Sequence, residues 1–168
     1  MTGVTIAEQV AAMAAATAGQ PPREVMDVMA REQGWGRIVN VSSGAAADPA
    51  AMVRGNTYVT TKAALEAHTL NLAAELAGSG VTANVYRPGS VDTAMQAWIR
   101  AQPPEKIGAA LHERFVRSYQ DGSLITPEQS ARSLMQHLAS DATGQIWSVD
   151  SNPPSTAAVD RDLVVEGP

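Results

Sequence analysis

The sequence predicts an α/β fold, in which a partial parallel sheet of about three strands is flanked by helices. Three short runs rich in β-branched residues are bounded by Gly, Ser and Pro, as is typical of buried strands. Longer segments with helical periodicity separate these runs. Strands that alternate with helices in this way pair in parallel, and we expect right-handed crossovers between them.

The first half of the predicted domain contains one strand and the longest helix. The strand is predicted at residues 38–41, where the apolar run Ile-Val-Asn-Val stops at a Ser-Ser-Gly sequence. A loop of small residues follows at 45–56. The helix is predicted at residues 57–78, because three leucines fall on one face and two nearby glycines provide a stop.

The second half contains two further strands and two helices. The run VTANVY predicts a strand at residues 81–86, which ends at a Pro-Gly sequence. Helices are predicted at residues 104–119 and 127–139, and the second has Thr126 as its N-cap with a proline in the first turn. The run QIWSV predicts the last strand at residues 145–149, where we expect its tryptophan to be core.

Three segments divide the chain. Residues 1–34 are predicted to be a helical N-terminal segment, with an alanine-rich helix at 6–18 and an amphipathic one at 22–33. Residues 35–150 are predicted to form the α/β domain. Residues 151–168 begin near a Pro-Pro sequence and have no periodicity, so we expect an irregular tail.

Composition excludes several classes of function. A chain of 168 residues with a net charge of −5 fits one domain or part of a larger one, and a pI near 5.1 argues against nucleic-acid binding. With no cysteine, disulfides and thiolate chemistry are excluded. No apolar run is long enough for a membrane span and no Lys or Arg precedes Arg23, so we expect a cytoplasmic protein without a signal peptide. The spacing of His68, His112 and His137 predicts no metal site.

Tyr58 and Lys62 are four residues apart near the start of the longest predicted helix, so both project from one face. A tyrosine normally titrates at about pH 10, and a nearby ammonium favours the phenolate, which makes the side chain a usable general acid or base. Ser43 follows the first strand, where ligands bind in open α/β sheets. Taken alone, this Tyr-x-x-x-Lys pattern also fits a partly buried tyrosine beside a solvated lysine.

Four motifs put this pair in context. They are GRIVNVSS at 36–43, YVTTKAA at 58–64, YRPGSVDT at 86–93 and DATGQI at 141–146. In this order and spacing, they resemble the short-chain dehydrogenase/reductase family over about residues 35–150. The resemblance implies a partial doubly wound, Rossmann-type parallel sheet that corresponds to the C-terminal half of the family's fold.

The resemblance also implies a role for each matching residue. Tyr58 would be the catalytic acid/base, Lys62 would assist it and bind the nicotinamide ribose, and Ser43 would orient the oxygen of an alcohol or carbonyl substrate. The cofactor would be NAD or NADP. The residues implied to contact it are Tyr58, Lys62, Pro88, Gly89, Val91 and Thr93. Residues 95–122 would cover the substrate, so Trp98 is expected either to line a substrate pocket or to pack between helices.

Two features depart from the family pattern. Ser43 precedes Tyr58 by 15 residues, which is slightly more than is common in the family, but the Ser-Ser-Gly ending favours Ser43 over Ser42 as the catalytic serine. The Gly-rich turn T-G-x-x-x-G-x-G, whose backbone amides approach the pyrophosphate, has no counterpart in the sequence. We therefore expect a chain without the N-terminal cofactor-binding half and without the asparagine of the family's catalytic tetrad.

Two functions from different classes follow. The first is an NAD(P)-dependent oxidoreductase acting on a small-molecule alcohol or carbonyl substrate, with Tyr58 as general acid/base. The second is a truncated, catalytically silent homologue that acts as an interaction or regulatory subunit. In either case we expect a homo-oligomer or pairing with a related full-length subunit, and cofactor affinity would discriminate between the two.

Overall fold

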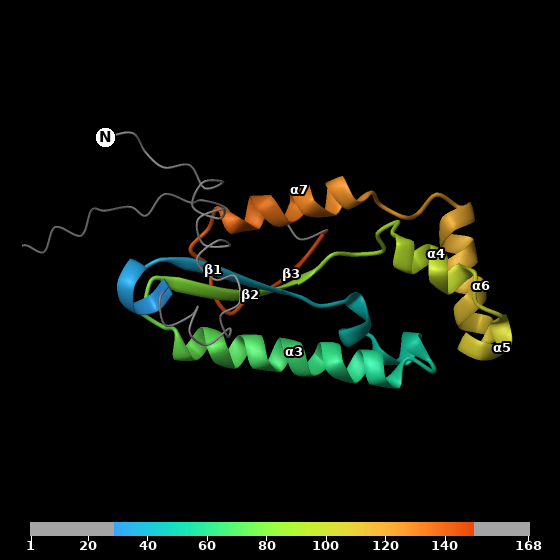
Figure 1. The fold of residues 1–168 in the computed structure, drawn as a ribbon, viewed down its shortest axis with the longest axis horizontal. Coiled ribbons are helices and arrows are strands. Elements are labelled where there is room, and N and C mark those ends of the chain that lie inside the picture. The colour runs from blue at the N-terminus through green and yellow to red at the C-terminus, as the bar shows by residue number, and fades with distance from the viewer. Residues whose placement is uncertain (1–28, 150–168) are drawn as a thin grey trace, which may run out of the picture.

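The computed structural model describes residues 29–149, which form a three-layer α/β arrangement (Figure 1). Its sheet contains β1 (Gly36–Val41), β2 (Val81–Arg87) and β3 (Ile146–Ser148), in the order β1-β2-β3. Both strand pairs are parallel. The predicted α/β class with three parallel strands is therefore confirmed, and β2 is the central strand, with six of its seven residues buried.

Helix α3 (Asn56–Glu75) covers one face of this sheet. Its buried Leu72 and Ala73 pack against Ala83 of β2, which is fully buried. A polar contact joins the same two layers, because Asn40 Nδ2 of β1 donates to Thr69 Oγ1 at 2.9 Å. Since side chains alternate between the faces of a strand, every second residue of β2 points to α3.

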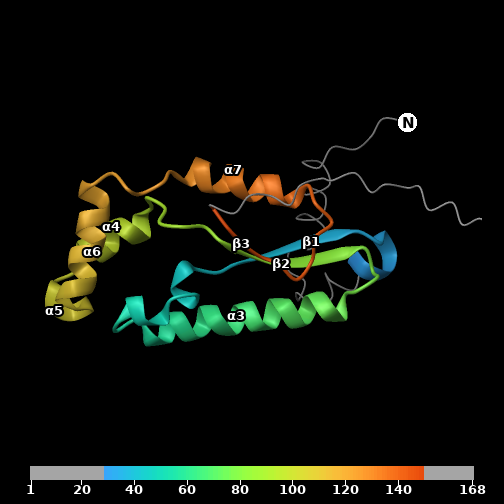
Figure 2. The same cartoon turned by 180° about the vertical axis from the view of Figure 1, so that it is seen from behind.

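Helix α7 (Pro127–Leu138) covers the opposite face (Figure 2). It begins with the predicted N-cap Thr126, whose side chain and that of Gln129 form a capping box. The hydroxyl of Tyr86 donates to Ser130 O at 2.7 Å, which attaches α7 to β2. The ring of His137 stacks on Trp147 of β3 at 4.9 Å, so the predicted core position of this tryptophan is confirmed.

The positions of α3 and α7 overturn one expectation from the sequence. The strand order advances in one direction across the sheet, but the two crossover helices lie on opposite faces. Two such crossovers have opposite hands, so the expectation of right-handed connections at both places is wrong at one of them. The connection from β2 to α7 is long and contains three further helices, and sequence patterns do not show on which face such a connection returns.

Those three helices lie together beyond the carboxyl ends of the strands, and we call them the distal helices: α4 (Ala94–Arg100), α5 (Pro104–Ile107) and α6 (Ala109–Gln120) (Figure 1). The single helix predicted at 104–119 is wrong, because Gly108 has a φ of +94° and breaks it in two. Helix α4 was not expected from the sequence. Two 3₁₀ turns, Gly44–Ala46 and Pro49–Met52, occupy the predicted loop after β1.

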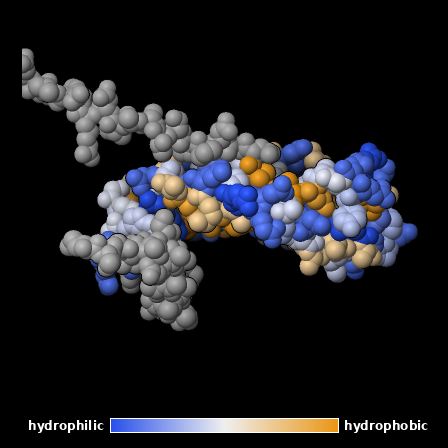
Figure 3. Space-filling view, turned by 90° about the horizontal axis from the view of Figure 1, so that it is seen from above, coloured by the Kyte–Doolittle hydropathy of each residue, from blue (hydrophilic) through white to orange (hydrophobic). Residues whose placement is uncertain are grey.

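The N-terminal side of the described region starts with a π-helical turn, Met29–Gln33, whose Met29 is buried. The helix predicted at 6–18, most of that at 22–33 and the tail at 151–168 lie outside the described residues. Between residues 29 and 149, no helix has the length and apolarity needed to cross a bilayer. Seen from the α7 side, polar and apolar side chains are mixed over the surface (Figure 3).

Candidate active site

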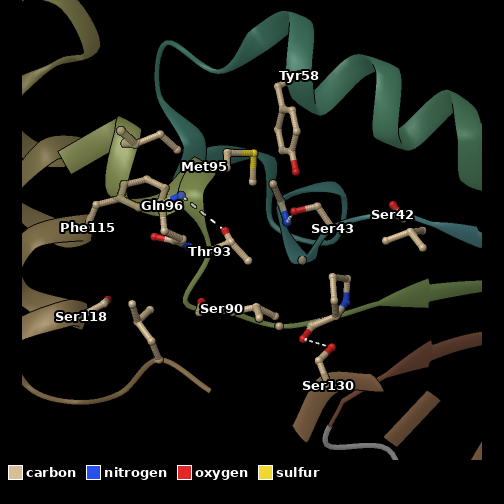
Figure 4. A pocket seen from close by; sticks show the side chains of 18 of the residues that line it. Ser42, Ser43, Tyr58, Ser90, Thr93, Met95, Gln96, Phe115, Ser118 and Ser130 are labelled. Atoms are coloured by element: carbon tan, nitrogen blue, oxygen red, sulfur yellow. Dashed lines mark hydrogen bonds between the residues drawn. The ribbon is translucent and has the colours of Figure 1, made fainter. Parts of the chain in front are cut away.

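A cavity of about 960 Å³ lies at the carboxyl ends of β1 and β2, between the sheet and the distal helices (Figure 4). This is the edge at which open α/β sheets bind ligands. Six of the seven residues singled out from the sequence line it, namely Ser43, Tyr58, Pro88, Gly89, Val91 and Thr93. Trp98 lines it as well and is 58% exposed, so it is not buried in a helix interface.

Ser43 and Tyr58 reach the cavity from two different elements. Ser43 is the N-cap of the first 3₁₀ turn, and its Oγ accepts a hydrogen bond from Ala45 N at 3.2 Å, which does not use its own hydroxyl proton. Tyr58 lies in the first turn of α3 and is 37% exposed. Figure 4 shows its hydroxyl directed into the cavity on the side where Ser43 lies.

Lys62 lies one turn after Tyr58 and is not part of the cavity wall. Its Nζ donates to Val41 O at 2.8 Å and is 6.0 Å from the centroid of the Tyr58 ring. The ammonium is therefore held between the end of β1 and the tyrosine. The helical spacing places Lys62 one turn after Tyr58 on the same side of α3, where its side chain reaches the carboxyl end of β1.

A largely buried ion pair beside the cavity joins three segments that the sequence patterns did not connect. The guanidinium of Arg87, at the end of β2, donates from Nε and NH2 to both carboxylate oxygens of Glu66 in α3, at 2.8 and 2.7 Å. Ser42 Oγ donates to the same carboxylate at 2.7 Å. The hydrogen bonds from Arg87 are the main reason that the pKa of Glu66 lies below its ordinary value. Burial of the carboxylate opposes this shift, and the hydrogen bond from Ser42 adds to it. The pKa of Arg87 is raised by the same carboxylate.

This cluster places both loops of the site. Ser42 directly precedes Ser43, and Arg87 directly precedes Pro88 and Gly89, so the ion pair fixes the chain where each strand ends. Sequence reasoning missed the cluster because its members are far apart in the chain. The one local signal is that Glu66 lies four residues after Lys62, and such a pair normally indicates a solvated helix face.

The loop after β2 is packed closely against its neighbours. Gly89 has a φ of +79°, and a Cβ at this position would meet Val149 Cγ1 at 2.8 Å, so only glycine fits without a shift. Ser130 Oγ of α7 donates to Pro88 O at 3.0 Å (Figure 4). Further along, Val91 and Ile125 form an isolated parallel bridge. The loop therefore has a defined path along the cavity.

Thr93 and the distal helices close the far side of the cavity. Thr93 is the N-cap of α4, and its Oγ1 accepts from Gln96 N at 3.4 Å. The loop after β1 contacts the distal helices through Arg114, whose NH1 donates to Ala51 O at 2.7 Å. A second contact runs from Arg54 NH1 to Glu105 O at 2.8 Å. The walls thus come from segments on both sides of α3 in the sequence.

The residues present fit the nicotinamide end of the implied cofactor. The hydroxyls of Ser43, Tyr58 and Thr93 border the same space as the backbone of Pro88 and Gly89. Within residues 29–149, no Gly-rich turn is available for a pyrophosphate. The same region contains no group of three or more His, Cys, Asp or Glu side chains gathered as metal ligands.

Comparisons with known proteins agree with this architecture. The sequence profile of the short chain dehydrogenase family matches residues 7–104. Over 130 residues, the chain is 36% identical to 2,3-dihydro-2,3-dihydroxybenzoate dehydrogenase of Escherichia coli K12, covering 76% of this chain and 51% of that protein. Over 122 residues, it is 40% identical to acetoacetyl-CoA reductase of Cupriavidus necator, covering 73% and 45%.

Solved structures give the same relationship. The KRED1-Pglu enzyme superposes with a TM-score of 0.64 at 26% identity, covering 74% of this chain and 51% of its own. The F189W actinorhodin polyketide ketoreductase with NADPH gives 0.60 at 26% identity, covering 75% and 49%. The chain spans about half the length of the relatives it matches. Because the family profile covers more than half of the sequence and the sheet and loops agree with it, the chain belongs to the short chain dehydrogenase family.

Proposed function

We propose that this chain carries the catalytic site of an NAD(P)-dependent oxidoreductase that acts on an alcohol or carbonyl. One observation carries the proposal. The hydroxyls of Ser43 and Tyr58 border one cavity at the carboxyl edge of the sheet, and the Lys62 ammonium lies 6.0 Å from the tyrosine ring. This arrangement supplies a hydrogen-bond donor, a proton donor and a positive charge beside one another.

Each side chain has a distinct role in this proposal. Ser43 donates a hydrogen bond to the substrate oxygen, and Tyr58 donates its proton to that oxygen during reduction or accepts it back during oxidation. Lys62 stabilises the phenolate that remains on Tyr58. The nicotinamide, when bound, supplies or accepts the hydride. Pro88, Gly89, Val91 and Thr93 would line its ring, while Tyr58 and Lys62 would contact its ribose.

The proposal is tested by separating cofactor binding from proton transfer. NADH and NADPH are titrated into the purified chain by fluorescence, and oxidation of the bound cofactor by a ketone is followed in the same samples. Tyr58→Phe should retain binding and lower the oxidation rate by at least about 100-fold, because general acid catalysis is removed. Tyr119→Phe is the matched control, since Tyr119 is exposed on α6 and does not line the cavity.

Two results would contradict the proposal. One is the absence of binding for both cofactors at millimolar concentration. The other is a Tyr58→Phe variant that oxidises the cofactor as fast as the wild type. A rate that falls equally in Tyr119→Phe would show a general loss of structure instead, so circular dichroism spectra of both variants accompany the assay.

The second candidate, a catalytically silent interaction subunit, is favoured by one feature of the sheet. Within residues 29–149, β1 pairs only with β2, and Val41 at its end is 49% exposed. Such an edge can pair with another strand, from a second copy or from a related full-length subunit. Absence of cofactor binding and of turnover in the wild type would support this candidate. A homo-oligomeric state and a cytoplasmic location remain predictions.

A further inference from the structure

The part of the cavity that lies beyond Tyr58 is walled by large apolar side chains. They come from α4, α6, α7 and the segment that leads into α7, and include Met95, Trp98, Ile99, Phe115, Leu124 and Leu134. Met95 is 57% exposed and Trp98 is 58% exposed. Apolar groups of this size facing an open cavity favour a ligand that removes them from water.

Charged groups on the cavity wall are few, and the one cation among them is engaged with the protein. The charged lining residues are Asp48 and Arg114. The guanidinium of Arg114 is engaged with the loop after β1, because NH1 donates to Ala51 O at 2.7 Å and NH2 to Met52 Sδ at 2.9 Å. Asp48 is exposed and carries a negative charge that repels a carboxylate or phosphate.

Two further cations lie near the cavity without lining it. Lys106 Nζ donates to Gln102 Oε1 at 3.0 Å and is 5.9 Å from the centroid of the Trp98 ring. Arg100 pairs with Asp92 at 3.6 Å and lies over the ring of Tyr119. Both charges are engaged with neighbouring groups, and that of Lys106 lies over the Trp98 ring of the apolar wall. A carboxylate placed there would lose water and would have to compete with these contacts for a partner.

We infer that the substrate of this site is an uncharged ketone or secondary alcohol with a large apolar body. This inference rests on the proposed function, because it assigns the substrate class of the same cavity. The carbonyl or hydroxyl lies at Ser43 and Tyr58, and the apolar body extends from there toward Phe115 (Figure 4) and toward Trp98, which also lines the cavity. Substrates that carry a carboxylate or phosphate on that body are disfavoured.

The test compares two aryl ketones that differ in charge, ethyl 4-acetylbenzoate and 4-acetylbenzoate, at pH 7. Binding to the full 168-residue chain is followed by the indole N–H signal of Trp98 in ¹H–¹⁵N NMR spectra, which is assigned by its loss in Trp98→Phe. The indole signal of Trp35, which does not line the cavity, is the internal control. The ester should shift the Trp98 signal with a Kd at least about tenfold lower than that of the acid.

A pair of variants makes the electrostatic argument specific. Ser118 of α6 lines the cavity (Figure 4), so Ser118→Lys adds a cation to the apolar wall. It should reduce the preference for the ester by at least about threefold. Ser118→Met adds a chain of similar length without charge and should leave the preference unchanged.

The inference is overturned if the acid binds as tightly as the ester, or if neither ketone moves the Trp98 signal at millimolar concentration. It is also overturned if Ser118→Met changes the preference as much as Ser118→Lys does. No cofactor is present in these titrations, so their outcome does not depend on hydride transfer. A chain that binds the ester but never oxidises NAD(P)H would contradict the proposed function and leave the substrate class standing.

Discussion

Ser42 and Ser43 are neighbours in the chain, but their hydroxyls face different partners. Ser42 is 3% exposed, and its Oγ donates to the carboxylate of Glu66 at 2.7 Å. Both serines line the cavity, but Ser43 Oγ accepts a long capping bond from Ala45 N and does not donate to Glu66. Ser42 is therefore bound to a carboxylate of the protein, whereas the hydroxyl of Ser43 can donate to a substrate.

Alanine substitution at each serine should therefore give opposite results. Ser42→Ala removes a hydrogen bond to a buried charge and should lower the free energy of unfolding by about 1–2 kcal/mol. Ser43→Ala removes only a long capping bond, so it should lower that free energy by less than about 1 kcal/mol and lower the rate of cofactor oxidation at least about tenfold. Urea denaturation and the ketone assay on both variants measure the two quantities. A larger loss of rate in Ser42→Ala than in Ser43→Ala would reverse the assignment.

Glu66 should be the carboxylate whose removal costs most stability. Glu66→Gln leaves Arg87 facing an amide in a largely buried position, so we expect a loss of roughly 2–3 kcal/mol at pH 7. Glu75→Gln, at the exposed end of the same helix, should cost less than about 0.5 kcal/mol. Chemical denaturation of the two variants gives both values.

The ion pair between Glu66 and Arg87 should stabilise the folded chain less as the pH becomes acidic. The pKa of Glu66 in the folded chain lies below its ordinary value of 4.5, chiefly because Arg87 donates to the carboxylate. Its contribution to stability is therefore complete above about pH 4.5 and is lost as the pH falls through the folded-state pKa. The difference between wild type and Glu66→Gln should shrink across that acidic range. If the difference in free energy of unfolding between wild type and Glu66→Gln stays constant until acid unfolds the chain, the ion pair is not the cause of that difference.

At the scale of the elements, two glycines between α3 and β2 offer a matched comparison. Gly78 and Gly80 both have a φ of +79°, but a Cβ at Gly78 would meet nothing within 4 Å, whereas one at Gly80 would meet Gly34 O at 2.0 Å. Gly78→Ala should cost roughly 1 kcal/mol from the left-handed backbone alone. Gly80→Ala should cost roughly 2–4 kcal/mol, because the backbone of residue 34 must also move. Equal losses in denaturation experiments would mean that this close approach is absent in solution.

The elements that sequence patterns predict best are those with local causes. The strands and α3 are marked by β-branched runs, leucine spacing and glycine stops, and Thr126 identifies the start of α7 by its own hydroxyl. The break at Gly108 is harder, because a single glycine inside a helical pattern is compatible with an unbroken helix. Helix α4 has seven residues and little periodicity beyond its cap at Thr93.

The candidate site likewise contains residues that sequence patterns predict and contacts that they do not. Ser43, Tyr58 and Lys62 are marked by their motifs and by helical spacing, so their proximity could be predicted. The Glu66–Arg87 pair, and the hydrogen bonds of the buried Asn84 to the loop before β3, join segments that are distant in sequence. The hand of the crossovers is likewise decided by tertiary packing. No periodicity in a single sequence reports such contacts.

At the scale of the whole molecule, the proposed function uses the described residues as one end of a dinucleotide site. In that proposal, Ser43, Tyr58 and the loop at 88–93 surround the nicotinamide, and no pyrophosphate turn exists between residues 29 and 149. In the Rossmann-type fold, that turn and the residues after it provide the contacts to the pyrophosphate and the adenosine. The nicotinamide end of the cofactor should therefore supply nearly all of the affinity of this chain.

Binding of reduced nicotinamide mononucleotide, which lacks the adenosine half, tests this division directly. We expect its Kd to lie within about threefold of that of NADH, since the adenosine gains no contacts in the described part of the chain. NADH and NADPH should bind equally for the same reason, because the residue that distinguishes the ribose hydroxyl from its phosphate belongs to the other half of the site. Fluorescence titrations of the three nucleotides under one set of conditions give these ratios. If NADH binds more than about tenfold tighter than the mononucleotide, an adenosine site is formed by residues outside 29–149 or by a second copy of the chain, and a titration at two protein concentrations distinguishes these sources.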